Sequence, residues 1–465
     1  MSPSRRETCG TCGTCGTCGT CGTMPPLGPN ETCCILQFKE SELDELMASD
    51  EQRNWNKRSI YKVRPCIADV HSKAYQPQVV SFGPYHHDND LLLPMEEHKR
   101  RALRHFVKRS RKPLERFRES LREVAQDIKE SYDELDSKWK AGGSEGAASQ
   151  FLDLMITDGC FMLEILRVAT QAKQEKDDYE VNDPIFSNHG KLRVIPYIRR
   201  DMLMLENQLP MLVLDQLVAV ESGGRKGNEF INRLIVKFFS SPSKVTGQCL
   251  HVLDVYRKSL LLPEIEVQHK QPKQRQGLIR SATELHGHGI QFKTGTTNLT
   301  DISFEKGVRG FLGFLGFPGF LKLPKIVVDD TTESAYLNLI AFEHCHVGAG
   351  NEVTSYIYLM DKIIDKEGDV ALLHDQGIIQ NAIGSDKAAA DLFNSLCKEV
   401  TLEPGSSLEA VHTKVSEYCK NAWYTSVANL LHTHFKSPWS LVSFIAAILL
   451  FGLTITQTVY TVLYP

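Results

Sequence analysis

The C-terminal end of the chain is a long run of residues without a single charge. From Ser437 to Pro465 there is no Asp, Glu, Lys or Arg, and the centre of the run is apolar. A bilayer core of about 30 Å needs roughly 20 such residues in a helix. Trp439 and Tyr460 lie at the two ends, where the aromatic residues of membrane helices gather. We therefore predict one continuous transmembrane helix, and its span includes Ser440, Leu441, Phe444, Leu450, Gly452 and Tyr460.

The alternative for this run is a buried core helix, because Thr454, Thr456 and Gln457 lower the hydrophobicity of its second half. We favour the span, since a soluble core helix of this length rarely lacks a charge on its solvent side. No apolar stretch near the N-terminus resembles a signal peptide, so we expect a tail anchor in the membrane. Lys420 and Lys436 precede the run and no charge follows it, which predicts a single-pass protein with its N-terminal body in the cytosol.

Residues 1–50 are predicted to form a disordered N-terminal arm. They open with a Thr-Cys-Gly repeat that places a thiol at every third position from Cys9 to Cys21. The Cys-x-x-Cys spacing also occurs in zinc and iron–sulfur sites. This repeat, however, has no flanking apolar or His residues with which to build a core, so we expect it to be unpacked and to bind no metal. Because Met24 follows the repeat, it is a second candidate for the start of the protein.

The rest of the composition is ordinary for a globular protein. Hydrophobic residues make up 42% and charged residues 24% of the 465 residues, and the net charge of −4 leaves no basic footprint for nucleic acid. Single cysteines among apolar residues indicate buried free thiols of a reducing compartment. The cysteines of this kind are Cys160, Cys249, Cys345, Cys397 and Cys419.

Apolar periodicity predicts a mainly α fold. A few short strands would make it formally an α+β fold. We expect one helical globular domain at 55–436, followed by the anchor at 437–465. Pro94 is placed as the first residue of a helix, and Pro113 is expected to restart it. The stretch 290–304 is rich in turn residues and has strand character. The predicted helices cover residues 94–140, 151–169, 201–220, 280–286, 332–360, 385–400 and 406–435.

The triplet Glu206-Asn207-Gln208 is the most informative polar motif. It lies in an apolar stretch that reads as a helix, and Pro210 would leave the Glu206 carbonyl without its helical partner. Asn207 and Gln208 can donate to such groups, and a buried Glu needs donors. We interpret these four residues as a structural motif around a kink, with a catalytic or ligand-binding Glu206 as the alternative.

Other polar groups do not form a convincing site. His86 and His87 follow a Gly-Pro turn, and a metal would need further ligands, for example Glu343, His344 and His346 or His286 and His288. Asp153 and Asp158 resemble a carboxylate pair but diverge on a helix. We therefore predict no catalytic, cofactor-binding or metal-binding residues, and no cofactor.

Two segments remain open to two interpretations. The stretch from Lys99 to Arg118 holds ten Lys and Arg residues. It could lie on an anionic lipid leaflet, or it could be a solvated helix face balanced by neighbouring glutamates. The Phe/Gly repeat from Gly310 to Phe320 is either a sticky exposed patch or filler in a loop.

A set of motifs, in this order along the chain, resembles the plant domain-of-unknown-function family 247, also called UPF0481. The motifs are Tyr75-x-Pro-x-x-Val-Ser-x-Gly-Pro-x-His-His87, Met95-Glu-x-x-Lys99, Asp158-Gly-Cys-Phe161, Asp201-x-x-x-Leu-Glu-Asn-Gln-Leu-Pro210, Asn338-Leu-Ile-Ala-Phe-Glu343 and Pro438-Trp439 before the anchor. The Thr-Cys-Gly repeat is absent from the family pattern, and the Phe/Gly repeat interrupts it. The resemblance implies a plant membrane protein of the plasma membrane, without established enzymatic activity. Some members of the family are implicated in pollen–stigma self-incompatibility of grasses.

These observations predict a non-enzymatic, tail-anchored protein in the lipid bilayer. Its cytosolic helical domain would contact an unknown protein partner, in signalling or recognition, and would bind no nucleic acid. The alternative is a membrane-bound, hydrolase-like enzyme that uses His86, His87 or Glu206.

Overall fold

The computed structural model describes residues 57–68, 71–139, 145–170, 179–241, 243–261, 280–307, 319–397, 407–420 and 438–463. All of them belong to the second of two compact units, which runs from Asn54 to Pro465. The predicted disordered arm with its Thr-Cys-Gly repeat lies outside the described residues. So does most of the Phe/Gly repeat, of which only Gly319 and Phe320 are described.

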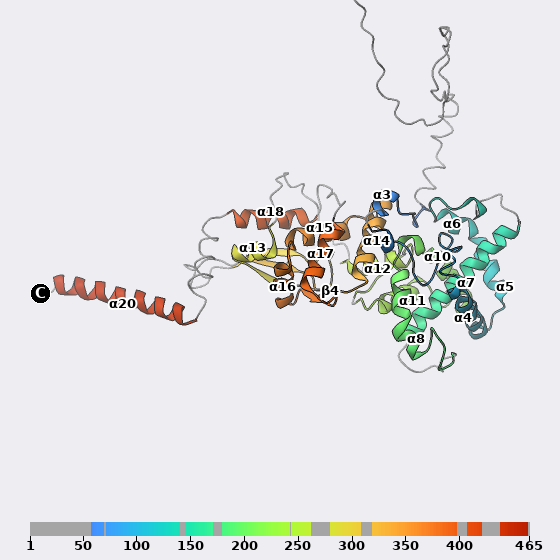
Figure 1. Cartoon of the computed structure of the whole chain (residues 1–465), viewed down its shortest axis with the longest axis horizontal. Coiled ribbons are helices and arrows are strands. Elements are labelled where there is room, and N and C mark those ends of the chain that lie inside the picture. Colours follow the sequence, from blue (N-terminus) through green and yellow to red (C-terminus); the bar gives the residue numbers. More distant parts are fainter. Residues whose placement is uncertain are drawn as a thin grey trace, which may run out of the picture. The chain divides into compact units, whose positions relative to one another are not determined.

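The described chain is mainly helical with a few short strands, as predicted (Figure 1). The elements before the first strand are α3 (Pro65–Ala68), η1 (Ser72–Ala74), α4 (Pro94–Ser110), α5 (Leu114–Glu123), α6 (Ala125–Glu130), η2 (Ser137–Trp139), α7 (Glu145–Thr170), α8 (Asn188–Arg193), α9 (Ile195–Asp201), η3 (Leu205–Asn207), α10 (Met211–Ser222), α11 (Asn228–Phe238), α12 (Val252–Leu260) and α13 (Ala282–Gly287), where η marks a 3-10 helix. The later elements are β1 (Ile290–Thr294), β2 (Ser303–Lys306), β3 (Gly319–Leu323), β4 (Ile326–Val328), α14 (Thr332–Cys345), α15 (Glu352–Ile363), α16 (Glu367–Asp375), β5 (Ile379–Asn381), α17 (Asp386–Leu396), α18 (Ser407–Cys419) and α20 (Pro438–Leu463).

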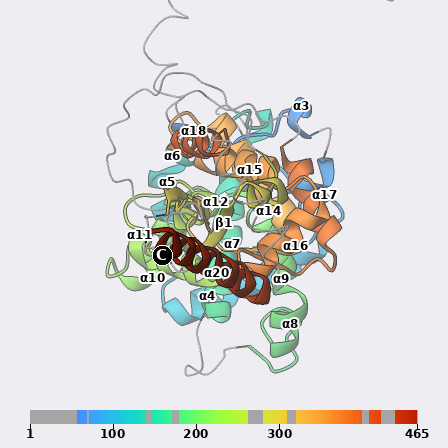
Figure 2. The same cartoon turned by 90° about the vertical axis from the view of Figure 1, so that its left-hand side faces the viewer.

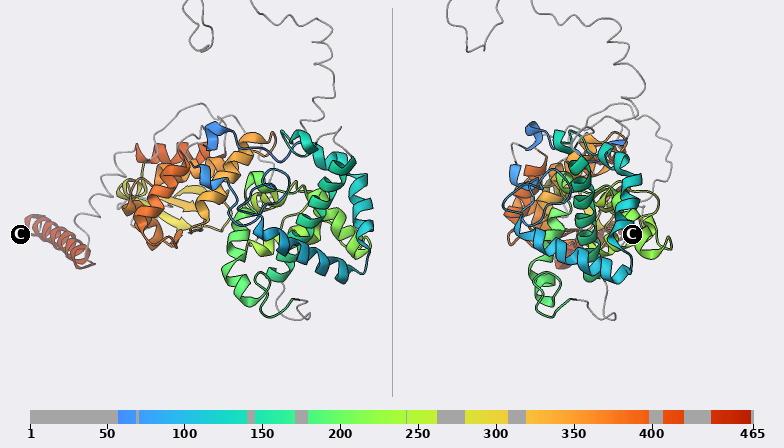
Figure 3. Two further views of the ribbon diagram at one scale, coloured as in Figure 1. Left: turned by 45° about the vertical axis from the view of Figure 1, so that its right-hand side comes forward. Right: turned by 90° about the vertical axis from the view of Figure 1, so that its right-hand side faces the viewer.

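Helix α7 is the centre of the first group of helices. Its middle is apolar almost all round and fully buried, because α4, α5, α10 and α11 pack around it (Figure 3). Gly159 allows α10 to approach closely, since a Cβ at this position would lie 2.5 Å from Cδ1 of Leu217. The apolar helix predicted at 151–169 is therefore the core of this group.

Two small sheets and a second set of helices form the later part. The three-stranded sheet has the order β1-β3-β2, with β1 parallel and β2 antiparallel to β3, and Ile290 opposite Gly319. Strands β4 and β5 pair in parallel. Helix α13 packs against β1 and α18 against β2, while α14, α15, α16 and α17 pack on one another (Figure 2). Helix α14 also contacts η1 and η3, which ties this part to the first.

Two predicted helices are in fact broken. The helix expected at 201–220 consists of the end of α9, the short η3 and then α10, with a bend of 107° between its two halves. The helix expected at 332–360 is divided into α14 and α15 by residues 346–351. In both places the apolar pattern continues across the break, so periodicity alone does not show where one helix ends and the next begins. The predicted roles of the two prolines are confirmed. Pro94 is the first residue of α4, and Pro113 is the N-cap residue of α5.

Helix α20 is continuous from Pro438 to Leu463 and contains all six predicted span residues. It is long and apolar enough to cross a bilayer, and its described side chains are exposed rather than packed in a core. Thr454, Thr456 and Thr458 each donate a hydroxyl hydrogen bond of 2.8 Å to the carbonyl four residues earlier. The threonines that lower its hydrophobicity thus satisfy their hydroxyls within the helix, as a bilayer requires.

Candidate functional site

The segment at 75–87, which we call the signature segment, has neither regular helix nor strand structure. Its amides nevertheless find buried acceptors on side chains. Asp201, at the end of α9, accepts with one oxygen from the amides of Gln78, Val79 and Val80 at 3.0, 2.7 and 3.1 Å. Burial raises the pKa of Asp201, and these three hydrogen bonds oppose the rise. One carboxylate therefore fixes three consecutive amides of the signature segment.

Asn207 binds the next part of the signature segment. Its Oδ1 accepts from the Phe82 amide at 2.6 Å, and its Nδ2 donates to the carbonyls of Val80 and Asp201, both at 3.0 Å. The Asn207 side chain is completely buried. All of its hydrogen-bonding groups are directed at backbone, so none is left for a ligand.

Gln208 has a similar arrangement. Its Nε2 donates to the carbonyls of Met202 and Met204 at 2.7 Å, and its Oε1 accepts from the Leu253 amide at 3.1 Å. Gln208 is extended, and Pro210 is the residue before α10. The predicted kink within one helix is thus wrong, because the motif is a 3-10 turn between two helices. The freed backbone groups of that turn are the ones that Gln208 binds.

A buried ion pair holds the signature segment from the other side. Lys99 Nζ lies 2.7 Å from Asp158 Oδ1 and 3.2 Å from the Ser81 hydroxyl. The other oxygen of Asp158 accepts from the Gly83 amide at 2.9 Å. Gly83 has φ of +74°, and a Cβ there would lie 2.8 Å from the Tyr132 hydroxyl, so this turn requires glycine.

The fold brings together Glu206 and His86, two of the three residues named for the enzymatic alternative. Glu206 Oε1 accepts from the Val63 amide at 2.7 Å, and its Oε2 lies 3.2 Å from His86 Nε2, within ion-pair range but outside hydrogen-bond geometry. His87 is not part of this pair, since its ring faces Trp139 at a centroid distance of 6.4 Å. Among the described residues, no serine, threonine or cysteine is hydrogen-bonded to the His86 ring. A nucleophile activated by this histidine is therefore not in place there.

The motif that begins at Asn338 binds the turn before the signature segment. Asn338 Oδ1 accepts from the Leu205 amide at 2.8 Å, and its Nδ2 donates to the Ala74 carbonyl at 2.9 Å. At the end of the motif, Glu343 is paired with Arg257 Nε at 2.8 Å and accepts from the Thr354 amide at 2.8 Å. Residues from four distant motifs thus meet around the signature segment.

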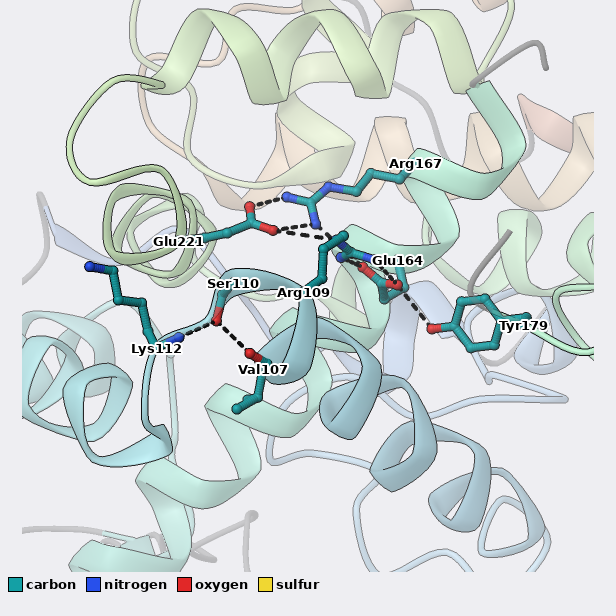
Figure 4. Close-up of polar contacts among 8 residues, drawn as sticks. All are labelled: Val107, Arg109, Ser110, Lys112, Glu164, Arg167, Tyr179 and Glu221. Carbon is teal, nitrogen blue, oxygen red and sulfur yellow. Dashed lines mark hydrogen bonds and ion pairs between the residues drawn. The ribbon is translucent and has the colours of Figure 1, made fainter. Parts of the chain in front are cut away.

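A second buried network lies between α4, α7 and α10 (Figure 4). Arg109 forms a two-point ion pair with Glu164, which also accepts from the Tyr179 hydroxyl at 2.9 Å. Arg167 forms a similar pair with Glu221. Since the charges are balanced within the cluster, we assign it to helix packing rather than to a site.

The histidines weighed as metal ligands are not gathered in the structure. His346 Nδ1 lies 3.0 Å from the Tyr61 hydroxyl and its ring stacks on Phe342, while Glu343 is engaged by Arg257. Within the described ranges, no three His, Cys, Asp or Glu residues are grouped so that they could hold a metal ion. Asp153 pairs with Arg118 at 2.8 Å, whereas the buried Asp158 pairs with Lys99. The two carboxylates therefore have different partners and do not act as a pair.

His251 is a buried titratable group that the sequence did not single out. Its Nδ1 accepts from the Asp254 amide at 3.2 Å and caps α12, and its Nε2 lies 3.0 Å from the Ser59 carbonyl. Burial lowers the pKa of His251 to about 4. Its position directly before an apolar helical pattern is the signal that could have identified it as a cap. Among the predicted free thiols, Cys160 and Cys249 are buried and Cys345, Cys397 and Cys419 are half-buried.

Comparison with known proteins agrees with the motif pattern. The sequence model of the family DUF247, described as a plant protein of unknown function, matches residues 60–453. The UPF0481 protein At3g47200 of Arabidopsis thaliana is 29% identical over 445 residues, which cover 87% of this chain and 86% of that protein. The putative UPF0481 protein At3g02645 of the same plant is 23% identical over 531 residues, covering 90% and 91%. No solved structure matches the chain.

Proposed function

This chain belongs to the DUF247 family of plant proteins of unknown function, and we propose that it is a tail-anchored membrane protein whose helical domain binds another protein rather than catalysing a reaction. The observation that carries the proposal is α20. This 26-residue helix has no charged residue, exposes its described side chains and satisfies its threonine hydroxyls internally. Such a helix is stable in a bilayer and poorly soluble in water.

The arrangement of the signature residues supports a binding module more than an enzyme. Asp158, Asp201, Asn207, Gln208 and Asn338 are all fully buried, and each accepts a hydrogen bond from at least one backbone amide. Catalytic groups need a partner on the substrate, which these side chains lack. Their role in this proposal is to fix a non-helical segment so that the surface around it has a defined shape.

The proposed location is the cytosolic side of a membrane, with the plasma membrane as the first to examine. Lys420 and Lys436 precede α20, and positive charge on this flank favours a cytosolic body. The free cysteines of the described residues agree with a reducing compartment. The net charge of −4 gives no reason to expect a nucleic-acid partner.

Membrane extraction tests the anchor. Full-length protein expressed in plant cells should stay with membranes through an alkaline wash, whereas protein truncated after Lys436 should be released. A tag at Met24 should be cut by protease added to sealed cytosol-side-out vesicles, and a tag after Pro465 should be protected. A truncated protein that still resists the wash, or the reverse protection pattern, would contradict the anchor or its orientation.

Proximity labelling tests the binding role. The labelling enzyme is fused to the N-terminus of the full chain and, as a matched control, to residues 437–465 alone. Proteins labelled only by the full chain are candidates for partners of the helical domain. If the two fusions label the same proteins, the helical domain recruits nothing beyond its membrane neighbours, and the binding proposal fails.

The contact between His86 and Glu206 is the observation that favours the enzymatic alternative, and it can be tested directly. Two residues that are 120 positions apart lie with their polar atoms 3.2 Å apart, and both side chains are partly exposed. If the pair is catalytic, Glu206→Gln and His86→Asn should abolish turnover of a substrate found by activity-based screening while leaving the unfolding temperature unchanged. If the pair only supports the fold, both variants should lower stability and no activity should depend on them.

A further inference from the structure

Helix α4 presents a face of unpaired positive charge. Arg100, Arg104 and Lys108 follow one another at intervals of four residues and are all exposed. At about 100° per residue, successive positions are roughly 40° apart around the helix, and all three lie within an arc of roughly 80°. Arg111 and Lys112, also exposed, continue the series in the turn after α4, where Lys112 is drawn in Figure 4. We call these five residues the cationic face.

The acids that could have balanced this charge are used elsewhere. Four glutamates lie in or near the basic stretch of the sequence. Three of them form ion pairs with cations that do not belong to the cationic face. These pairs are Glu96 with Lys99 at 2.6 Å, Glu119 with Arg116 at 3.3 Å, and Glu115 with Arg118 at 3.4 Å and Arg122 at 3.6 Å. These three glutamates therefore neutralise Lys99, Arg116 and Arg118 within the basic stretch, and none of them pairs with a residue of the cationic face.

The nearby acids on other elements are also engaged. Asp183 pairs with Arg101 at 3.0 Å, and Glu164 pairs with Arg109. In the part of the chain that the structure describes, none of the five cations of the cationic face is in an ion pair, and Glu97 is the one acid on the same helix face. The face therefore carries a net charge of about +4, as five cations less one acid, and offers it to an external anion.

We propose that the cationic face binds the anionic lipid headgroups of the leaflet in which α20 is anchored, and so sets which side of the helical domain faces the cytosol. This inference rests on the proposed membrane anchor. Between the last described residue of the body, Lys420, and the start of α20 there are residues 421–437. A chain of this length reaches at most about 60 Å when fully extended, so the body stays close to the membrane surface.

Charge complementarity favours lipid as the anion. The cytoplasmic leaflet is negatively charged, and each Lys or Arg near it contributes about a fivefold gain in binding. The anchor already holds the helical domain near the membrane surface. The cationic face therefore has to orient the domain but does not have to recruit the protein to the membrane. Leu93 precedes α4 on the same helix face and is exposed, which adds an apolar contact at the end of the series.

Headgroup quenching in vesicles tests the orientation with the full chain. A fluorescent amino acid is placed at Glu97, within the cationic face, or at Val347, an exposed position after α14, as a reference. The protein is inserted into vesicles of phosphatidylcholine alone or mixed with phosphatidylserine, each with a headgroup-quenching lipid. We expect quenching at position 97 to exceed that at 347 only in the anionic vesicles. It should be lost in about 1 M salt, where the Debye length is near 3 Å.

Charge reversal identifies the residues responsible. The variant with Arg100, Arg104 and Lys108 all replaced by Glu should show the same quenching at position 97 in both vesicle types. The matched control replaces Lys73, Lys387 and Lys414, three exposed lysines elsewhere, by Glu and should behave like the parent protein.

The outcomes separate this inference from the anchor. Protein that resists alkaline extraction from the vesicles but shows equal quenching in both vesicle types overturns the cationic-face proposal alone. Protein that is extracted overturns the anchor and the proposal with it. Equal loss of quenching in the test and control variants would assign the effect to net charge, and would also contradict the proposal.

Discussion

Lys99 and Asp158 form an ion pair in the interior of the protein, with 2.7 Å between Nζ and Oδ1 and no exposed surface on either side chain. Glu96 forms a second ion pair with Lys99, with 2.6 Å between Oε1 and Nζ. Burial raises the pKa of Asp158, and the attraction of Lys99 opposes this rise. The pair joins α4 and α7 and, through the Gly83 amide, the signature segment.

Removing one partner of this pair should be more harmful than removing both charges. Lys99→Met leaves Asp158 buried without its cation, which costs roughly 3–5 kcal/mol. The double variant Lys99→Met with Asp158→Asn should be more stable than the single one, because the uncompensated charge is gone and Asn still accepts from Gly83. Chemical unfolding of the full chain in detergent measures both. Lys387→Met, at an exposed position, is the control; a single variant as stable as the double would contradict the assignment.

Asn207→Leu should destabilise the protein without a specific functional defect. The change removes the hydrogen-bond partner of the buried Phe82 amide and of the Val80 carbonyl. A buried unsatisfied group costs about 1–3 kcal/mol, so we expect a lower unfolding temperature and lower abundance in cells. The exposed Asn182→Leu is the matched control and should change little. A stable Asn207→Leu protein that has lost only partner binding would instead make the triplet a functional site.

His251 should make the protein less stable at mildly acidic pH. Its pKa is about 4 in the folded state, against 6.5 for an ordinary histidine. The unfolded state therefore binds the proton first, and stability is lost as pH falls from about 6.5 to about 4. The total loss from this one group is roughly 3 kcal/mol, since one pKa unit corresponds to about 1.4 kcal/mol.

The variant His251→Asn isolates this contribution. Asn has no proton to gain in this range and can still cap α12 with its side-chain oxygen. Unfolding free energies measured between pH 4 and pH 7 should fall less steeply for the variant than for the parent protein. Parallel curves would show that His251 does not titrate between the folded and unfolded states.

Local sequence signals predicted the parts of the fold that depend on local physics. Pro94 and Pro113 marked helix starts because proline lacks an amide that a first turn does not need. The uncharged run predicted α20 because a bilayer-length helix is set by composition. The existence of one central apolar helix, α7, followed from its lack of a polar face.

The meeting of distant polar residues was not predictable in this way. Asn207, Asp201 and Asn338 bind amides and carbonyls more than 100 positions away in sequence, and no periodicity encodes those pairings. The break before Pro210 was also misread, since an apolar pattern continues through it while the backbone turns. The pairing of Glu96, Glu115 and Glu119 with particular cations depends on side-chain geometry, and only the structure shows which cations remain free.

The last prediction concerns α20. Replacing both Leu449 and Leu450, at its centre, by Arg should prevent stable insertion, because each arginine at mid-bilayer depth in place of leucine costs roughly 3 kcal/mol. The same two arginines at Val462 and Leu463, near the end of the helix, should be tolerated, since long cationic side chains reach the interface from there. All four positions are similarly exposed in the structure, so the two variants differ in depth along the helix and not in packing. Alkaline extraction of full-length protein from plant membranes measures the retained fraction. The central variant should be released and the terminal one retained; equal retention of both would mean that the chain is held by something other than the bilayer-spanning helix.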